Sequence, residues 1–195
     1  KSWSLARLIE EIARHRCKAI VVDATGEFST VGGSVIHAHI GKRLNQDTQS
    51  LEVSLPYFQL LESDLFAVFQ PTGDVQAPKL RAAIRTLKLL ELEPHLAIHG
   101  NFIKANRNKL QYLEAYSRHA REIEGNTTSF NIFKLADQLK FECVNEIRSA
   151  TETDYWGGYN SHEESSVFPL ISRVIDATCS LHLEPVFKPE GLHSL

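Results

Sequence analysis

The sequence predicts an α/β protein in which a short α/β region is followed by a large helical region. The first 75 residues alternate helical and strand-like apolar patterns, and helical spacing dominates from about residue 76. At 195 residues and 43% hydrophobic composition, the chain is long enough to bury a sizeable core. We therefore expect an α/β core over residues 1–75, a helical region of the same domain over 76–185, and the start of a returning core strand over 186–195.

An amphipathic helix is expected at the start of the chain. Its apolar residues recur with the spacing of one buried helix face, at Leu5, Leu8, Ile9, Ile12 and Ala13. The following run, Ala19–Asp23, is typical of a buried strand with an acidic residue at its end, and the turn Ala24–Glu27 closes it.

Short elements complete the expected α/β region. In order they are a strand over 34–40, a polar loop over 45–50, a strand over 51–55 that Pro56 ends, and a helix from a Ser63 cap to Phe69. A loop over 70–74 leads into the helical region.

The helical region begins at Pro78, which suits the first turn of a helix that ends before Pro94. Gly125 is expected to end the next helix. The remaining pattern predicts helices over 102–123, 132–147 and 170–183, a polar loop over 151–166, and the start of a strand at Val186–Phe187.

Composition excludes several classes of protein. The net charge of −3 argues against a protein that coats DNA through bulk basic charge, although it says little about a motor whose DNA contacts line a pore. Three widely spaced cysteines favour a reducing cytosol, so we expect a cytoplasmic protein. No apolar run approaches the roughly 20 residues that span a bilayer, and we expect no membrane association. The absence of methionine fits a partial chain.

Lys1 and Ser2 match the last two residues of the phosphate-binding pattern G-x-x-x-x-G-K-[ST]. A triphosphate needs a cation for the charge on its outer oxygens and backbone N–H groups at a helix N-terminus. Lys-Ser at a helix start, followed by a strand that ends in Asp23, is half of a mononucleotide-binding unit. We therefore expect Lys1 and Ser2 to contact a nucleotide.

Three stretches resemble the ATPase core of the HerA–FtsK superfamily, in its prokaryotic HerA-like branch. Lys1–Ser29 contains the turn Asp23-Ala24-Thr25-Gly26-Glu27-Phe28, which resembles the family's Asp-x-x-Gly-Glu-Tyr turn with Phe28 in place of Tyr. The other two stretches are Leu55–Phe66 and Gln76–Ile84 with its continuation. The spacing from Lys1 to the turn is the most specific feature of this resemblance.

The resemblance implies a hexameric, ring-shaped, double-stranded DNA translocase or helicase of RecA-like fold. It implies ATP and Mg²⁺ as cofactors, and a nuclease or effector enzyme as partner in DNA end processing, repair or phage defence. Lys1 would contact the β- and γ-phosphates, Ser2 and Asp23 would lie at Mg²⁺, and Asp23 and Glu27 would act near the attacking water. The glycines of the loop, the Walker B acids and a trans arginine have no counterpart here, so these 195 residues alone are not expected to hydrolyse ATP.

Each of these residues also has a simpler interpretation. Asp23 can serve only as an acceptor for turn hydrogen bonds, and Glu27 can be a solvated turn residue. A basic stripe of Lys79, Arg81, Arg85 and Lys88 predicts contact with DNA or a neighbouring subunit, whereas a solvated helix face is the more common explanation.

Other candidate sites are weaker. His37 and His39 share a strand face but lack a third metal ligand nearby, and His95 and His99 are expected in a loop, so structural roles are favoured. Trp156–Tyr159 pairs aromatic residues with glycines and could contact DNA or a partner. Two rival functions remain: a non-catalytic scaffold that docks an effector through the helical region, and a small P-loop kinase or GTPase.

Overall fold

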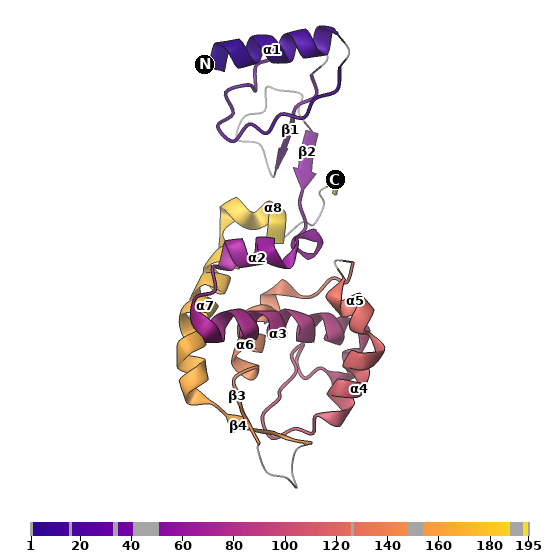
Figure 1. The fold of residues 1–195 in the computed structure, drawn as a ribbon, viewed down its shortest axis with the longest axis vertical. Helices are drawn as coiled ribbons and strands as arrows, with labels where there is room; N and C mark the ends of the chain where they lie inside the picture. The colour runs from indigo at the N-terminus through magenta and orange to yellow at the C-terminus, as the bar shows by residue number, and fades with distance from the viewer. Residues whose placement is uncertain are drawn as a thin grey trace.

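The fold was analysed in a computed structural model that describes residues 2–15, 17–32, 35–40, 51–125, 127–147, 154–187 and 193–194. Figure 1 shows a small N-terminal lobe above a larger helical body. We define the N-terminal lobe as the described residues between 2 and 54 together with strand β5 (His193–Ser194), and the helical body as the described residues between 57 and 187. The chain is mixed α/β with mostly helical elements, as expected, and the finer assignment to a RecA-like fold stays a prediction.

The N-terminal lobe contains one helix and a small parallel sheet. Helix α1 (Ser2–Arg14) confirms the first predicted helix. Strand β2 (Leu51–Ser54) pairs in parallel with β1 (Ala38–Ile40) on one side and with β5 on the other. The strand that ends before Pro56 is therefore confirmed, whereas the described part of the expected 34–40 strand pairs only over its last three residues.

The expected buried strand Ala19–Asp23 is wrong for this structure. Residues 17–23 form no strand, and they have no ladder partner among the described residues. Ile20 is 96% exposed and Val22 is 91% exposed. A strand is stabilised by backbone pairing and by burial of its side chains, and this segment receives neither.

The helical body is built around a single apolar core. Its elements in chain order are η1 (Tyr57–Gln59), α2 (Glu62–Phe69), α3 (Gly73–Leu92), η2 (Pro94–Leu96), α4 (Leu110–Arg118), α5 (Ala120–Glu124), η3 (Ile132–Lys134), α6 (Leu135–Phe141), β3 (Val144–Glu146), β4 (Trp156–Tyr159), α7 (Ser161–Cys179), η4 (Leu181–Leu183) and α8 (Glu184–Phe187). Helix α3 crosses the centre of the body in Figure 1 and packs against α6 and α7. Phe69, Leu80, Leu139 and Leu170 are completely buried in this core.

Two helix starts differ from the expected ones. Helix α2 begins at Glu62 because the Asp64 carboxylate accepts a hydrogen bond from the Leu61 amide at 3.0 Å, so Ser63 is not the cap. Helix α3 begins at Gly73, five residues before Pro78. The Gln76 side chain accepts a hydrogen bond from the Thr72 amide at 2.9 Å, and this contact fixes the earlier start.

The predicted helix over 102–123 is wrong in its first half. Residues 102–109 are not helical, and the helical part is split into α4 and α5 at His119, although Gly125 ends it as expected. The Phe102 amide donates to Gln138 Oε1 at 2.9 Å and the Phe102 ring is buried. These long-range contacts hold the segment in an irregular conformation that local spacing does not reveal.

The predicted elements after residue 131 are also partly wrong. The helix over 132–147 ends at Phe141, and β3 then pairs antiparallel with β4, inside the expected loop 151–166. Helix α7 starts already at Ser161 because Asn160 caps it, accepting from the Glu163 amide at 3.1 Å. Val186 and Phe187 belong to α8 rather than to a strand, and β5, later in the chain, pairs with β2. The domain boundaries themselves stay predictions.

A buried polar network lies inside the helical body. Glu142 is 3% exposed, and its carboxylate forms a short ion pair with Lys104, which is 8% exposed. The same carboxylate accepts hydrogen bonds from Thr86 Oγ1 at 2.8 Å and from Gln138 Nε2 at 3.0 Å. The Lys104 ammonium also lies over the Tyr112 and Trp156 rings, at 4.9 and 5.2 Å from their centroids. This network joins α3, α6 and β4.

None of the helices among the described residues is long and apolar enough to cross a membrane.

Candidate nucleotide site

The candidate site begins at the N-terminus of α1. Ser2 is the first residue of this 13-residue helix, and Lys1 lies outside the described residues. The first turn carries no acidic side chain, so the unpaired amides and the positive end of the helix dipole face no competing carboxylate of their own turn. Such a helix start is chemically suited to an anionic phosphate group.

The Asp23 carboxylate organises the turn that follows residues 17–22. Its Oδ1 accepts hydrogen bonds from the Gly26 amide at 2.9 Å, the Glu27 amide at 3.2 Å and Thr25 Oγ1 at 3.3 Å. Its Oδ2 accepts one from the Phe28 amide at 2.8 Å. Gly26 adopts φ +74°, a left-handed conformation that favours glycine and lets the chain fold back toward the carboxylate.

These contacts set the charge of Asp23. The hydrogen bond from the Phe28 amide is the main reason why the pKa of the Asp23 carboxyl lies below its ordinary value. Burial is the next largest effect and opposes it, and the contacts from Gly26 and Thr25 lower the pKa further. The carboxylate is therefore ionised at neutral pH. An ionised carboxylate offers about four acceptor positions, and Oδ2 uses only one of its own in the turn.

Glu27 differs from Asp23 in its environment. It contributes its backbone amide to the turn, and its side chain is exposed to solvent. Asp23 is thus the residue that holds the turn, as its simpler interpretation proposed, while the Glu27 side chain faces solvent. The sequence pattern placed both acids correctly on the turn but could not separate these two environments.

A Mg²⁺ ion would fit the chemistry of the Asp23 carboxylate in this turn, whereas the side chain of Ser2 lies outside what the structure describes. Carboxylate and hydroxyl oxygens are ligands that Mg²⁺ accepts, and it usually keeps several of its waters, which suits the remaining acceptor position on Asp23 Oδ2. Among the described residues, no group of three or more His, Cys, Asp or Glu side chains forms a metal site. No hydrogen bond joins the described side chains of α1 to the turn, so the grouping of Lys1, Ser2 and Asp23 stays a prediction.

The predicted basic stripe on α3 is engaged inside the chain. Arg81 pairs with Glu62 at 2.6 Å and Arg85 pairs with Glu124 at 2.7 Å. Lys79 contacts Glu163 at 2.7 Å. These cations connect α3 to α2, α5 and α7, and contact with DNA or a subunit stays a prediction.

Lys88, the last residue of the stripe, is buried. Its ammonium donates to the backbone oxygens of Gly125 at 2.6 Å and Ile123 at 3.2 Å. Desolvation lowers the pKa of Lys88, against smaller opposing contributions from the nearby carboxylates. Lys88 therefore serves as a cation at the C-terminus of α5, where it offsets the helix dipole.

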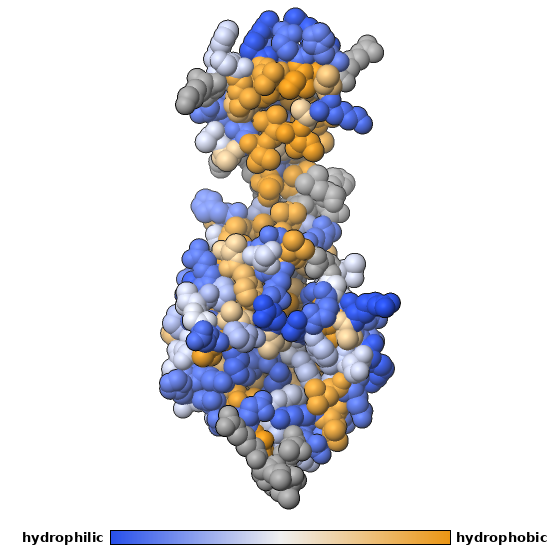
Figure 2. Space-filling view, in the orientation of Figure 1, coloured by the Kyte–Doolittle hydropathy of each residue, from blue (hydrophilic) through white to orange (hydrophobic). Residues whose placement is uncertain are grey.

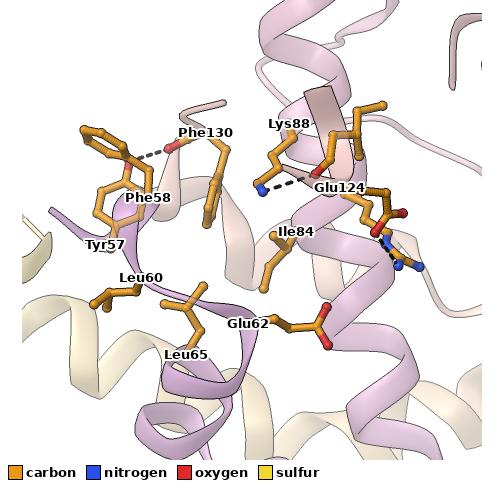
Figure 3. A pocket seen from close by; sticks show the side chains of 11 residues that line it. Tyr57, Phe58, Leu60, Glu62, Leu65, Ile84, Lys88, Glu124 and Phe130 are labelled. Atoms are coloured by element: carbon orange, nitrogen blue, oxygen red, sulfur yellow. Dashed lines mark hydrogen bonds and ion pairs between the residues drawn. The ribbon is translucent and has the colours of Figure 1, made fainter. Parts of the chain in front are cut away.

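Lys88 and Arg85 also line a small pocket between α2, α3 and α5 (Figure 3). Its lining also includes the apolar side chains of Tyr57, Leu65 and Ile84. Its volume is about 50 Å³, which is room for a few water molecules and far too little for a nucleotide. This pocket is separate from the Asp23 turn.

The two histidines His37 and His95 contact neighbouring parts of the chain. His37 Nε2 lies 2.7 Å from the Val31 carbonyl oxygen, so it fixes the chain before β1. His95 contacts Glu93 at 3.4 Å near the end of α3. Trp156 of β4 is buried beside Lys104, whereas Tyr159 at the other end of this strand is exposed.

An α/β lobe with a helix start suited to phosphate and an ionised aspartate turn is the kind of arrangement found in nucleotide-using enzymes. A family model described as the central domain of the helicase HerA matches residues 1–154. The chain therefore belongs to the HerA family, in the HerA–FtsK superfamily, and this membership indicates an ATPase of that type. A comparison with curated proteins finds no match.

Proposed function

We propose that this chain is part of an ATP-dependent double-stranded DNA translocase of the HerA type. The full-length protein would work in the cytoplasm as a homo-oligomer, in the form of a hexameric ring, beside a nuclease or a defence effector. The observation that carries the proposal is the family match over residues 1–154, which includes both the α1 start and the Asp23 turn. The four hydrogen bonds to Asp23 support it because they hold the turn that presents Glu27.

In this proposal each site residue has a defined role in binding or hydrolysing ATP. Lys1 neutralises charge on the outer phosphates of ATP, and the α1 amides share that charge. Asp23 would fix the turn and lie at the Mg²⁺, and the exposed Glu27 would orient the attacking water. Mg²⁺, when bound, supplies positive charge at the phosphates, with Ser2 and Asp23 as the residues on its side.

The test is DNA-stimulated ATP turnover by the full-length protein. We expect Lys1→Ala to lower kcat by at least about 100-fold, because charge stabilisation at the transferring phosphoryl group is lost. Lys18→Ala is the matched control, since Lys18 is exposed and lies outside the proposed site, and it should keep wild-type turnover. Wild-type turnover in Lys1→Ala would contradict the proposal.

The two acids are distinguished in the same assay. Glu27→Gln should lower kcat and leave ATP binding intact, because only the orientation of water is lost. Asp23→Asn should weaken binding and turnover together, because one amide nitrogen replaces an acceptor of the turn. Equal, small effects for both substitutions would contradict the division of tasks.

A scaffold that docks an effector enzyme is the second candidate. The observation that favours it is the self-contained core of the helical body, whose basic stripe is already paired within the chain. Equilibrium binding of ATP to the full-length protein separates the two candidate functions, because the translocase must bind ATP. A full-length protein that bound an effector enzyme but no ATP would favour the scaffold and contradict the translocase.

A further inference from the structure

The carboxylate of Glu93, at the end of α3, lies mostly beneath the surface of the helical body, with 13% of its side chain exposed. The surface of this body is mainly hydrophilic on the face that Figure 2 shows. One Glu93 oxygen lies 2.8 Å from Arg118 Nη1 and 3.2 Å from His119 Nε2. The other oxygen lies 3.4 Å from His95 Nδ1. Basic side chains from α4, from the junction of α4 and α5, and from η2 therefore meet at this carboxylate.

His119 joins two helices and has one ring nitrogen without a hydrogen bond. Its amide donates to the Ala115 carbonyl oxygen of α4 at 3.1 Å, and its carbonyl oxygen accepts from the Ile123 amide of α5 at 3.0 Å. Its Nε2 faces Glu93, whereas its Nδ1 is buried and has no hydrogen-bond partner among the described residues. This Nδ1 lies 3.8 Å from Oε1 of Glu122, a side chain of α5.

The two protonation states of the His119 ring differ at Nδ1. In the neutral ring that donates through Nε2 to Glu93, Nδ1 is a buried acceptor without a donor, which costs free energy. When the ring takes one further proton from solvent, Nδ1 becomes a donor that faces Glu122. The cation then lies between the carboxylates of α3 and α5, the Arg118 guanidinium of α4 opposes it, and His95 of η2 reaches the other oxygen of Glu93. Protonation thus adds an attraction between His119 and α5.

We propose that His119 is a pH-dependent latch, which in its protonated form holds α5 against the end of α3 and in its neutral form lets α5 open more often. The inference goes beyond the proposed function and does not depend on it. Helix α5 already packs against α3, so the latch acts on an existing contact. Histidine is the side chain whose ordinary charge change falls between pH 5 and 8, so the latch responds to changes within that range.

Helix α5 covers two cations of the basic stripe on α3. Its Glu124 carboxylate pairs with Arg85 at 2.7 Å. The backbone oxygens of Ile123 and Gly125 accept hydrogen bonds from the Lys88 ammonium. Because the Ile123 side chain is 1% exposed, opening of α5 is a local unfolding event rather than a free movement. Such an opening releases both cations together, and the latch therefore sets how often they are free.

The test is hydrogen exchange of the full-length protein at pH 6 and at pH 8, read by mass spectrometry on the peptide that covers α5. Measured rates are converted to protection factors, because intrinsic amide exchange itself depends on pH. We expect the amides of Ile123 and Gly125, both hydrogen-bonded within α5 and its junction, to be about threefold better protected at pH 6. This is the size expected for one ion pair between partly exposed side chains. Protection of the α7 amides reports overall stability and serves as the reference. Equal relative protection of α5 at the two pH values would overturn the proposal.

Substitutions in the full-length protein identify the ring that responds. His119→Gln keeps a donor for Glu93 but carries no charge, so the pH response of α5 should vanish. His95→Gln is the matched control, since His95 contacts the same carboxylate with a side chain that is 71% exposed, and it should keep the response. A response that persists in His119→Gln, or one that is lost in His95→Gln, would overturn the proposal.

A third substitution keeps the test decisive if His119→Gln fails to fold. The Glu122 side chain is 52% exposed, so Glu122→Gln should leave the fold intact. The new side-chain amide can donate to the bare Nδ1 of the neutral ring and no longer attracts the protonated ring. The greater protection of α5 at pH 6 should therefore disappear in Glu122→Gln. An unchanged pH response in this variant would overturn the proposal.

Discussion

The two regions of this chain use similar residues but reach different degrees of burial. In the helical body, Leu139 and Leu170 are fully buried and the charged pair Lys104–Glu142 is enclosed with its hydrogen bonds satisfied. In the N-terminal lobe, the described apolar side chains that are buried are Ile9, Val31 and Val53, each 8% exposed. The difference shows that an apolar pattern predicts what a segment can bury, while the neighbours that pack on it decide whether it does.

The largest effect that we expect is the difference in stability between two leucine substitutions, one in each region. Leu170→Ala in α7 should lower the free energy of unfolding by about 4 kcal/mol, through lost burial and the cavity left behind. Leu8→Ala in α1 should change it by less than about 0.5 kcal/mol, because Leu8 is 54% exposed. Urea unfolding followed by Trp156 fluorescence in a Trp3→Phe background measures both. Equal losses would show that the two regions share one core.

The next effect concerns charged pairs. Lys104→Met should cost about 3 kcal/mol because it leaves the buried Glu142 carboxylate without its cation. Arg7→Met, which removes the exposed pairs to Glu10 and Glu11, should cost less than about 0.5 kcal/mol. The same unfolding assay applies, and the double variant Lys104→Met with Glu142→Leu should recover most of the loss. A double variant no more stable than Lys104→Met would contradict a simple unpaired-charge penalty.

Cysteine reactivity sharpens the comparison without perturbing the fold. Burial raises the pKa of the Cys143 thiol to about 11, so little thiolate is present at pH 8. Cys17 of the lobe and Cys179 of α7 are exposed. With iodoacetamide at pH 8, we expect Cys143 to react at least about 100-fold more slowly than the other two, as measured by peptide mass spectrometry. Rapid labelling of Cys143 would mean that the body opens readily.

The smallest of these expected effects is the loss of stability of the Asp23 turn at low pH. Because the pKa of Asp23 in the folded chain lies below the ordinary value of 3.8, its carboxylate stabilises the turn fully above about pH 3.8 and loses this as the pH falls through the folded-state pKa. The amide resonance of Phe28 should therefore titrate below pH 3.8 and stay constant between pH 5 and 7. A midpoint at or above 3.8 would mean that the hydrogen bonds to Asp23 are not formed in solution.

Local signals predicted part of the fold. Apolar spacing predicted α1. Single residues with fixed backbone preferences predicted two ends: Pro56 the end of β2, and Gly125 the end of α5. The irregular segment 102–109 and the hairpin of β3 and β4 were missed. They depend on contacts between distant residues, such as Gln138 with Phe102, which no local period encodes.

The candidate site was predictable to a similar extent. The order of Lys-Ser, helix and acidic turn indicated the family, and the match over residues 1–154 confirms it. The separate environments of Asp23 and Glu27 required the structure, because they depend on which turn amides point at which oxygen. The basic stripe on α3 had a helical period, yet its partners come from α2, α5 and α7 and could not be read from that period.

The most direct test of the contrast between the two regions is native-state hydrogen exchange on the 195-residue chain itself. We expect amides in the central turns of α3, α6 and α7 to exchange slowly, at rates set by global unfolding, and those of Ile20, Val21 and Val22 to exchange at nearly the rate of an unfolded peptide. Slow exchange at residues 20–22 in this chain would show that their amides are protected, and it would contradict this contrast between the two regions.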